Sequence, residues 1–231
     1  MPEAIVGTAF FPGGYDLWNP AGTLPLPKFP VGKIMVLGHD FHSEAGYEES
    51  RARGSERLSQ PTWKNLIDVL TRASIGLEEC FFTNVYMGLR KGDKTTGPFP
   101  GATDDRFVQH CRTLLLKQIA TQRPSLIITL GVNAPVMLAS LSNDLPSRRI
   151  GLGLKYLNDS NAVVSKVTFL DLPNFLTTTV ALIHPCLRGP NLRHRRYRGL
   201  EGDEAEILML EDARGIARTS KDWELGKQTN W

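Results

Sequence analysis

Short apolar runs alternate with amphipathic stretches through most of the chain, and this alternation limits the folds open to it. The apolar runs fall at 34–37, 80–83, 126–130 and 178–183. Stretches with apolar residues at helical spacing fall at 62–73, 104–120, 133–141 and 204–218. Strands that alternate with helices form a mostly parallel sheet with helices on both faces. The sequence therefore predicts an α/β fold, a three-layer αβα sandwich around a mostly parallel four- or five-stranded central sheet, with 163–170 as the extra strand.

The length and composition fit one folded domain. The chain has 231 residues, of which 41% are hydrophobic and 22% charged, as in ordinary globular proteins. Residues 1–30 are rich in glycine and proline and are expected to form an N-terminal arm, which leaves 31–231 as a single domain. The start of the chain lacks the pattern of a signal peptide, and no apolar run is long enough to span a membrane. We expect a cytoplasmic monomer with no membrane partner.

The cysteines give no sign of a metal centre. Cys80, Cys111 and Cys186 are far apart, and none belongs to a Cys-x-x-Cys pair. A zinc or iron–sulfur site normally needs four ligands at short spacings. We therefore expect no metal cluster, no cofactor and no disulfide framework, which suits a reducing compartment.

Polar residues stand at the ends of three predicted strands. Asp40 comes after the first, Asn84 ends the second, and His184 follows the fourth. Ligands of open α/β sheets bind beyond the carboxyl ends of the strands, so these side chains are expected at one rim. Taken singly, each has a structural explanation as a turn former or a packed loop residue. Their occurrence at corresponding strand ends favours a functional site.

A cluster of arginines follows His184. Within eleven residues the chain places Arg188, Arg193, Arg195, Arg196 and Arg198. The net charge is only +3, so the cluster is either a solvated face, the commoner case, or a phosphate-binding edge. The spacing prevents all five from facing one ligand. We expect two or three to contact phosphate and one, such as Arg196, to pair with Glu201 or Asp203.

Five short motifs, in order along residues 34–198, resemble those of the uracil-DNA glycosylase superfamily. They are Gly38-His39-Asp40, Pro61-Thr62-Trp63-Lys64-Asn65, Phe82-Thr83-Asn84, Leu130-Gly131 with Ala134, and His184-Pro185-Cys186. The resemblance implies a DNA glycosylase that flips a base out of single- or double-stranded DNA and hydrolyses its N-glycosidic bond. The setting it implies is base excision, in DNA repair or in antiviral defence against DNA with modified bases.

The resemblance also implies roles for individual residues. Asp40 and His184 would be catalytic, because a carboxylate stabilises the cationic sugar and a histidine N–H stabilises negative charge on the departing base. Asn84 would read the edge of the base, since its amide both donates and accepts hydrogen bonds. The residues expected to contact DNA are Leu187 or Arg188 as the wedge that enters the base stack, and Thr62, Cys186, Arg193 and Arg195.

The motifs differ from those of the family at the positions that select the base. Phe41 and His42 stand where uracil-specific members have Pro and Tyr, and His42 is smaller than the tyrosine that excludes the methyl group of thymine. Phe41, Tyr47 and Phe82 are candidates to stack on the base, with Phe41 ranked last because it can pack under the loop. The charged stretch 43–58 is either a solvated loop or a polar wall for a larger base. The expected substrate is uracil or a modified pyrimidine such as those of bacteriophage DNA.

Two other functions stay open at this point. One is a non-catalytic nucleic-acid-binding protein on the same fold, which the joint presence of Asp40 and His184 disfavours. The other is a nucleotide-binding enzyme of the doubly wound type. It is disfavoured because the chain contains neither a Gly-x-Gly-x-x-Gly nor a Walker motif.

Overall fold

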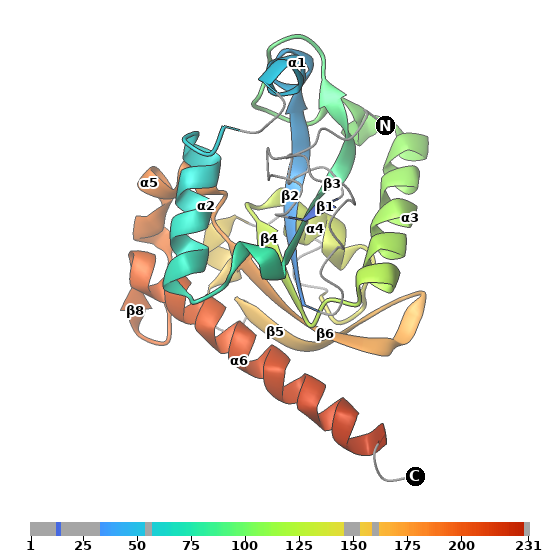
Figure 1. The fold of residues 1–231 in the computed structure, drawn as a ribbon, viewed down its shortest axis with the longest axis vertical. Helices are drawn as coiled ribbons and strands as arrows, with labels where there is room; N and C mark the ends of the chain where they lie inside the picture. The colour runs from blue at the N-terminus through green and yellow to red at the C-terminus, as the bar shows by residue number, and fades with distance from the viewer. Residues whose placement is uncertain (1–12, 15–32, 54–56, 146–152, 159–161, 229–231) are drawn as a thin grey trace.

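The computed structural model describes residues 13–14, 33–53, 57–145, 153–158 and 162–228 (Figure 1). Its centre is a six-stranded sheet with the order β1-β3-β2-β4-β6-β5. The strands are β1 (Gly13–Gly14), β2 (Ile34–Ser43), β3 (Cys80–Arg90), β4 (Leu126–Leu130), β5 (Val163–Phe169) and β6 (Leu172–Leu182). β3, β2, β4 and β6 run parallel, whereas β5 and the two-residue β1 lie antiparallel at the edges. The predicted mostly parallel sheet is confirmed, including its extra strand.

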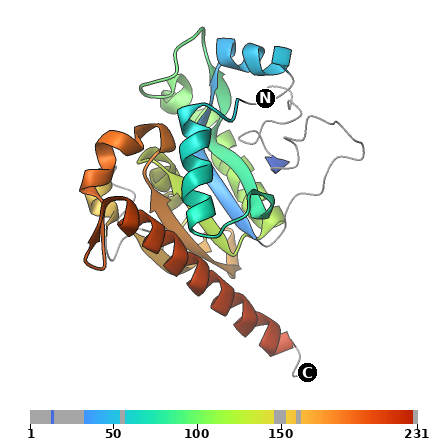
Figure 2. The same ribbon diagram turned by 60° about the vertical axis from the view of Figure 1, so that its left-hand side comes forward.

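Helices cover both faces of the sheet (Figures 1 and 2). One face carries α2 (Pro61–Arg72) and α6 (Gly202–Gln228), and the other carries α3 (Asp105–Gln122) and α4 (Asn133–Ala139). Successive residues of a strand point to opposite faces, so Val36 packs toward α2 and α6 while Met35 packs toward α3 and α4. These two apolar cores make the three layers of the predicted αβα sandwich.

Shorter elements connect these layers. They are α1 (Glu44–Arg53), η2 (Leu77–Glu79), η3 (Pro100–Thr103), η5 (Leu154–Leu157), η7 (Pro185–Leu187), α5 (Arg188–Asn191), η8 (Leu192–His194), β7 (Arg196–Tyr197) and β8 (Leu200–Glu201). None of the helices in the described part of the chain has the length and apolar character that a membrane span requires.

The expected N-terminal arm is described only at Gly13–Gly14. These two residues pair with Phe82 and Phe81 of β3 and so extend the edge of the sheet. The rest of 1–30 lies outside the described residues.

β2 and β3 are longer than the apolar pattern predicts, and this shapes the rim of the sheet. β2 pairs with β4 only from Ile34 to Leu37, but it pairs with β3 as far as Ser43. The two strands therefore continue as a ribbon past the end of β4, with a register shift between Asp40 and His42. Asp40 lies inside β2 rather than after it, and Asn84 lies inside β3 rather than at its end, which corrects the sequence prediction.

Candidate active site

Asp40 lies in the ribbon and is held by two basic side chains. Arg90 of β3 donates from Nε to Oδ1 (2.9 Å) and from Nη2 to Oδ2 (2.8 Å), and Nδ1 of His39 lies 2.7 Å from Oδ2. Burial raises the pKa of Asp40, but the hydrogen bonds and charges of His39 and Arg90 outweigh it and hold that pKa below its usual value. Asp40 is therefore a carboxylate at neutral pH. An ionised Asp40 accepts hydrogen bonds only, which places a proton on Nδ1 of His39.

Arg90 also fixes the segment that follows β3. Its side chain is 3% exposed and donates to the carbonyl oxygens of Thr96 (3.2 Å), Gly97 (2.9 Å) and Pro98 (3.0 Å). One guanidinium thus ties the ribbon carboxylate to 96–98. Arg90 does not stand out in the sequence, because nothing in the local pattern shows which acidic residue a strand arginine will meet.

His184 lies just beyond the end of β6, on the other side of β4 from Asp40. The residue after β4, Gly131, lies close to His184 and needs to be a glycine. It has a φ of 78°, and a Cβ there would lie 3.2 Å from the Cβ of His184. The N–H of Gly131 donates to the carbonyl of Leu182 (2.9 Å). Burial lowers the pKa of His184, and the charge of His39 lowers it further, while Asp40 opposes both. His184 is thus within electrostatic reach of His39 and Asp40, and its imidazole is neutral at pH 7.

The start of α2 packs against the His184 loop. Nδ2 of Asn65 donates to the carbonyl of Pro185 (2.8 Å), and Nδ1 of His184 lies 3.0 Å from Sγ of Cys186. Burial raises the pKa of the Cys186 thiol, and a hydrogen bond with Thr62 moderates the rise. α2 begins at Pro61 with Gln60 as its N-cap, so Thr62 lies in the first turn of the helix. The structure brings Thr62, Cys186 and His184 together.

Two of the predicted DNA-contacting arginines are structural instead. Arg195 is 0% exposed; it donates to the carbonyl oxygens of Leu157 and Ala181 and lies 3.5 Å from Glu206. Arg188 is buried and pairs with both Asp203 and Glu206. Assigning Arg188 and Arg195 to DNA was wrong, because a guanidinium enclosed by carboxylates and carbonyls cannot reach a phosphate.

Glu206 holds the His184 loop to α6. Its side chain is fully buried and accepts the N–H of Ile183 (2.6 Å) as well as the guanidinium of Arg188. Burial raises the pKa of Glu206, while Arg188 and Arg195 lower it. The sequence carried a signal for this residue: an acidic side chain stands in the stripe formed by Ala205, Met209, Leu210 and Ala213.

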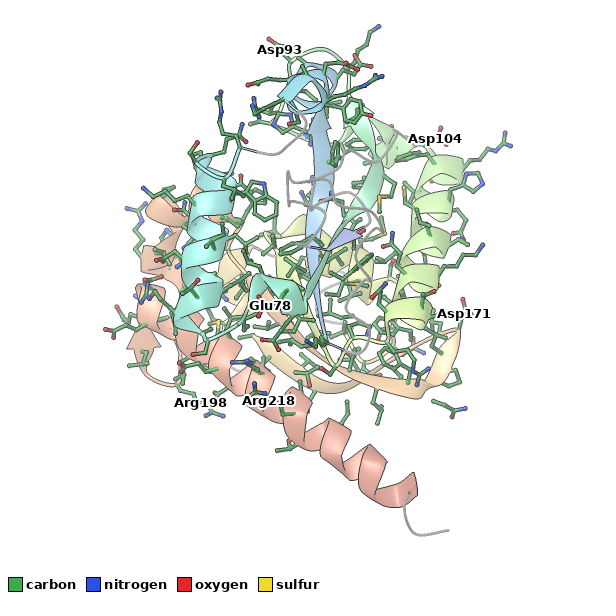
Figure 3. All side chains as sticks on the ribbon, viewed as in Figure 1. Glu78, Asp93, Asp104, Asp171, Arg198 and Arg218 are labelled. Atoms are coloured by element: carbon green, nitrogen blue, oxygen red, sulfur yellow. The ribbon has the colours of Figure 1, made fainter. Side chains whose placement is uncertain are left out.

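The other residues of the arginine cluster face solvent. Arg193 is exposed, and Arg196 pairs with Glu201 (2.7 Å), a pairing that the sequence analysis anticipated. Arg198 pairs with Asp212 (2.9 Å); Figure 3 shows it beside α6, far from Asp93 at the tip of the ribbon. Leu187 is 52% exposed directly after the His184 loop. Of the residues of 187–195 that are expected to contact DNA, Arg193 and Leu187 are thus the ones with exposed side chains.

The aromatic residues predicted to stack on a base are buried in the protein. Phe41 of β2 and Tyr47 of α1 pack edge to face on each other, with ring centroids 5.8 Å apart. Phe82 is wholly buried against Trp63 of α2, at 5.4 Å. Each of these three rings packs in the protein interior, and Phe82 is the most deeply buried of them. The ranking of Phe41 as a packing residue agrees with this arrangement.

Asn84 and His42 occupy different environments. Asn84 is 2% exposed and lies opposite Gly38 in the β2–β3 register, at the base of the ribbon. His42 is half-buried, with its Nδ1 3.1 Å from the hydroxyl of Ser43. Within the described residues, no group of three or more His, Cys, Asp or Glu side chains is arranged to hold a metal ion.

Comparisons with known proteins add no relative. No family model matches the chain, and no curated protein is significantly similar to it. The likeness to the uracil-DNA glycosylase superfamily is thus carried by the five motifs.

Proposed function

We propose that this protein is a DNA glycosylase that flips uracil or a modified pyrimidine out of DNA and hydrolyses its N-glycosidic bond. The observation that carries the proposal is the placement of Asp40 and His184 on either side of the end of β4, with the start of α2 packed against the His184 loop. This arrangement sets an anionic and a neutral polar group at the same rim of the sheet, where ligands of open α/β sheets bind.

Asp40 supplies negative charge in this mechanism. Bond breakage leaves a sugar with oxocarbenium character, which a preorganised carboxylate stabilises. A carboxylate has about four lone-pair directions, and His39 and Arg90 occupy three of them. The remaining direction on Oδ1 can accept a hydrogen bond from the attacking water and so orient it. Because Arg90 lowers its basicity, Asp40 acts by position and charge rather than by taking up a proton early.

His184 supplies the hydrogen bond to the departing base. The Cys186 thiol stays protonated at neutral pH and can donate to Nδ1 of His184. The proton of the neutral imidazole is then on Nε2, which donates to the base carbonyl as negative charge develops there.

The DNA is held by the surface around this loop. Leu187 is exposed, whereas Arg188 is enclosed by its ion pairs, so Leu187 is the residue that enters the base stack. The first turn of α2, the backbone N–H of Cys186 and the side chain of Arg193 contact phosphates.

The test is a search for abasic sites in single- and double-stranded oligonucleotides that carry uracil or modified pyrimidines. Asp40→Asn and His184→Ala are each expected to lower excision by about 10²–10³-fold, the usual loss for one such electrostatic contact. Asp93→Asn, which removes an exposed carboxylate at the tip of the ribbon, should leave the rate unchanged. Wild-type rates in both site variants would overturn the proposed mechanism.

A non-catalytic DNA-binding protein is the second candidate, and one observation favours it. Both oxygens of Asp40 are engaged by Arg90, which offsets the charge that catalysis would use. The same assay separates the two functions. Binding of the oligonucleotides without an abasic site at any tested base would select the binding protein.

A further inference from the structure

A cavity of about 530 Å³ lies between the ribbon, the segment 97–102, α3 and α4. His39 of the ribbon forms part of its wall, so it adjoins the Asp40 site, but neither Asn84 nor His184 lines it. We infer that this cavity binds a nucleotide, with the base against its aromatic wall and the acceptor oxygens toward Arg112. The inference goes beyond the proposed excision reaction and does not depend on it.

The aromatic wall of the cavity is built before any ligand arrives. Tyr86 stacks on Phe99 with ring centroids 5.0 Å apart and planes within 9°, and His39 meets Tyr86 edge-on at 5.3 Å. Phe107 stacks on Phe99 from α3 at 5.7 Å. Arg90 lies over Phe99 at 5.6 Å and hydrogen-bonds 96–98, which fixes the ring in place. A rigid wall of this kind suits a flat heteroaromatic ring, because little ordering is needed on binding.

The polar groups of the cavity have spare hydrogen-bonding capacity. Nη2 of Arg112 donates to the carbonyl of Ser140 (2.9 Å), but its Nε and Nη1 have no partner in the described part of the chain. Asn133 is exposed, and its amide also has no partner there. Nδ1 of His39 faces Asp40, which leaves Nε2 to meet a ligand. The cavity thus offers a cation, an amide that donates and accepts, and an imidazole nitrogen.

The charge and size of the cavity select the class of ligand. None of the described residues that line it is acidic, so Arg112 gives it a positive character. Its volume lies in the range of small-molecule and cofactor sites and exceeds what a single base needs. An aromatic surface with a guanidinium and an amide matches the ring and the phosphate of a nucleotide, since Arg binds phosphate through paired N–H groups. The nucleotide is either free in solution or one unit of a bound DNA strand.

The test measures binding rather than excision. Isothermal titration of the full chain uses two probes: deoxyadenosine monophosphate and a single-stranded DNA hexamer without modified bases. Arg112→Gln is expected to weaken binding about tenfold or more, the loss typical of one charge-assisted hydrogen bond. Val136→Trp, which fills the cavity from α4, should remove binding. Arg106→Gln is the matched control, because Arg106 is exposed on the same helix and does not line the cavity.

The pattern across the two probes identifies the source of the nucleotide. If the monophosphate binds and the cavity variants weaken it, the ligand is a free nucleotide. If only the hexamer binds and Arg112→Gln weakens it, the cavity holds a unit of the strand. Asn133 is exposed, so Asn133→Ala should fold normally and give a smaller loss, which keeps the test decisive if the tryptophan variant misfolds. Binding of neither probe, or wild-type binding by all the cavity variants, overturns the inference.

Discussion

The ion pair between Arg90 and Asp40 should be among the most costly contacts to break in this protein. Replacing Arg90 by Met keeps the volume of the side chain but removes five hydrogen bonds: two to Asp40 and one each to the carbonyls of Thr96, Gly97 and Pro98. Removal of one partner of a buried pair leaves an uncompensated charge and costs about 3–5 kcal/mol. For a chain of this length that corresponds to a fall in Tm of roughly 10 °C.

A double-mutant cycle separates the pair from the other contacts of Arg90. Asp40→Asn alone should cost about 1–3 kcal/mol, since the amide oxygen still accepts one hydrogen bond. In the double variant the carboxylate charge is gone. Its loss of stability should therefore be about 2 kcal/mol smaller than the sum of the losses in the two single variants. Urea unfolding followed by circular dichroism measures each free energy of unfolding. Additivity within about 0.5 kcal/mol would refute the argument that the two side chains act as one buried pair.

Three further predictions concern the His184 loop. Glu206→Gln should lower the free energy of unfolding by about 3 kcal/mol in urea titrations, because it leaves buried arginine charge unpaired, whereas Glu204→Gln on the exposed face of α6 should not. The NMR titration of His184 should give a pKa below 6.5, and His39→Asn should raise that pKa. Stability should then be lost as the pH falls below 6.5, because the unfolded chain binds a proton there while the folded histidine does not. A midpoint at or above 6.5 would contradict the assigned burial. Arg193→Ala should weaken binding to every DNA sequence and reduce the salt slope by about 0.7–0.9, without changing base preference; a changed base preference with an unchanged slope would place Arg193 in the base pocket instead.

The local sequence pattern determined the layers of this fold. The run Leu126-Ile127-Ile128-Thr129-Leu130 is short, apolar on both sides and rich in β-branched residues, which favours a strand covered on both faces, and β4 has these bounds. The order of strands and helices then requires crossovers between parallel strands. Asp40 and His184 could be picked out for the same reason, since parallel strands bring residues beyond their carboxyl ends to one edge.

The tertiary structure decided which side chains are available for function. Arg193 and Arg195 stand two residues apart in one cluster, yet the first is exposed and the second is fully buried beside Glu206. No local pattern distinguishes them, because burial depends on where α6 packs against the end of β6. Likewise Arg90 meets Asp40, fifty residues earlier, only through the β2–β3 register. Periodicity along the chain reports which face of an element is apolar, while the partners of its charged residues are fixed by contacts between elements distant in sequence.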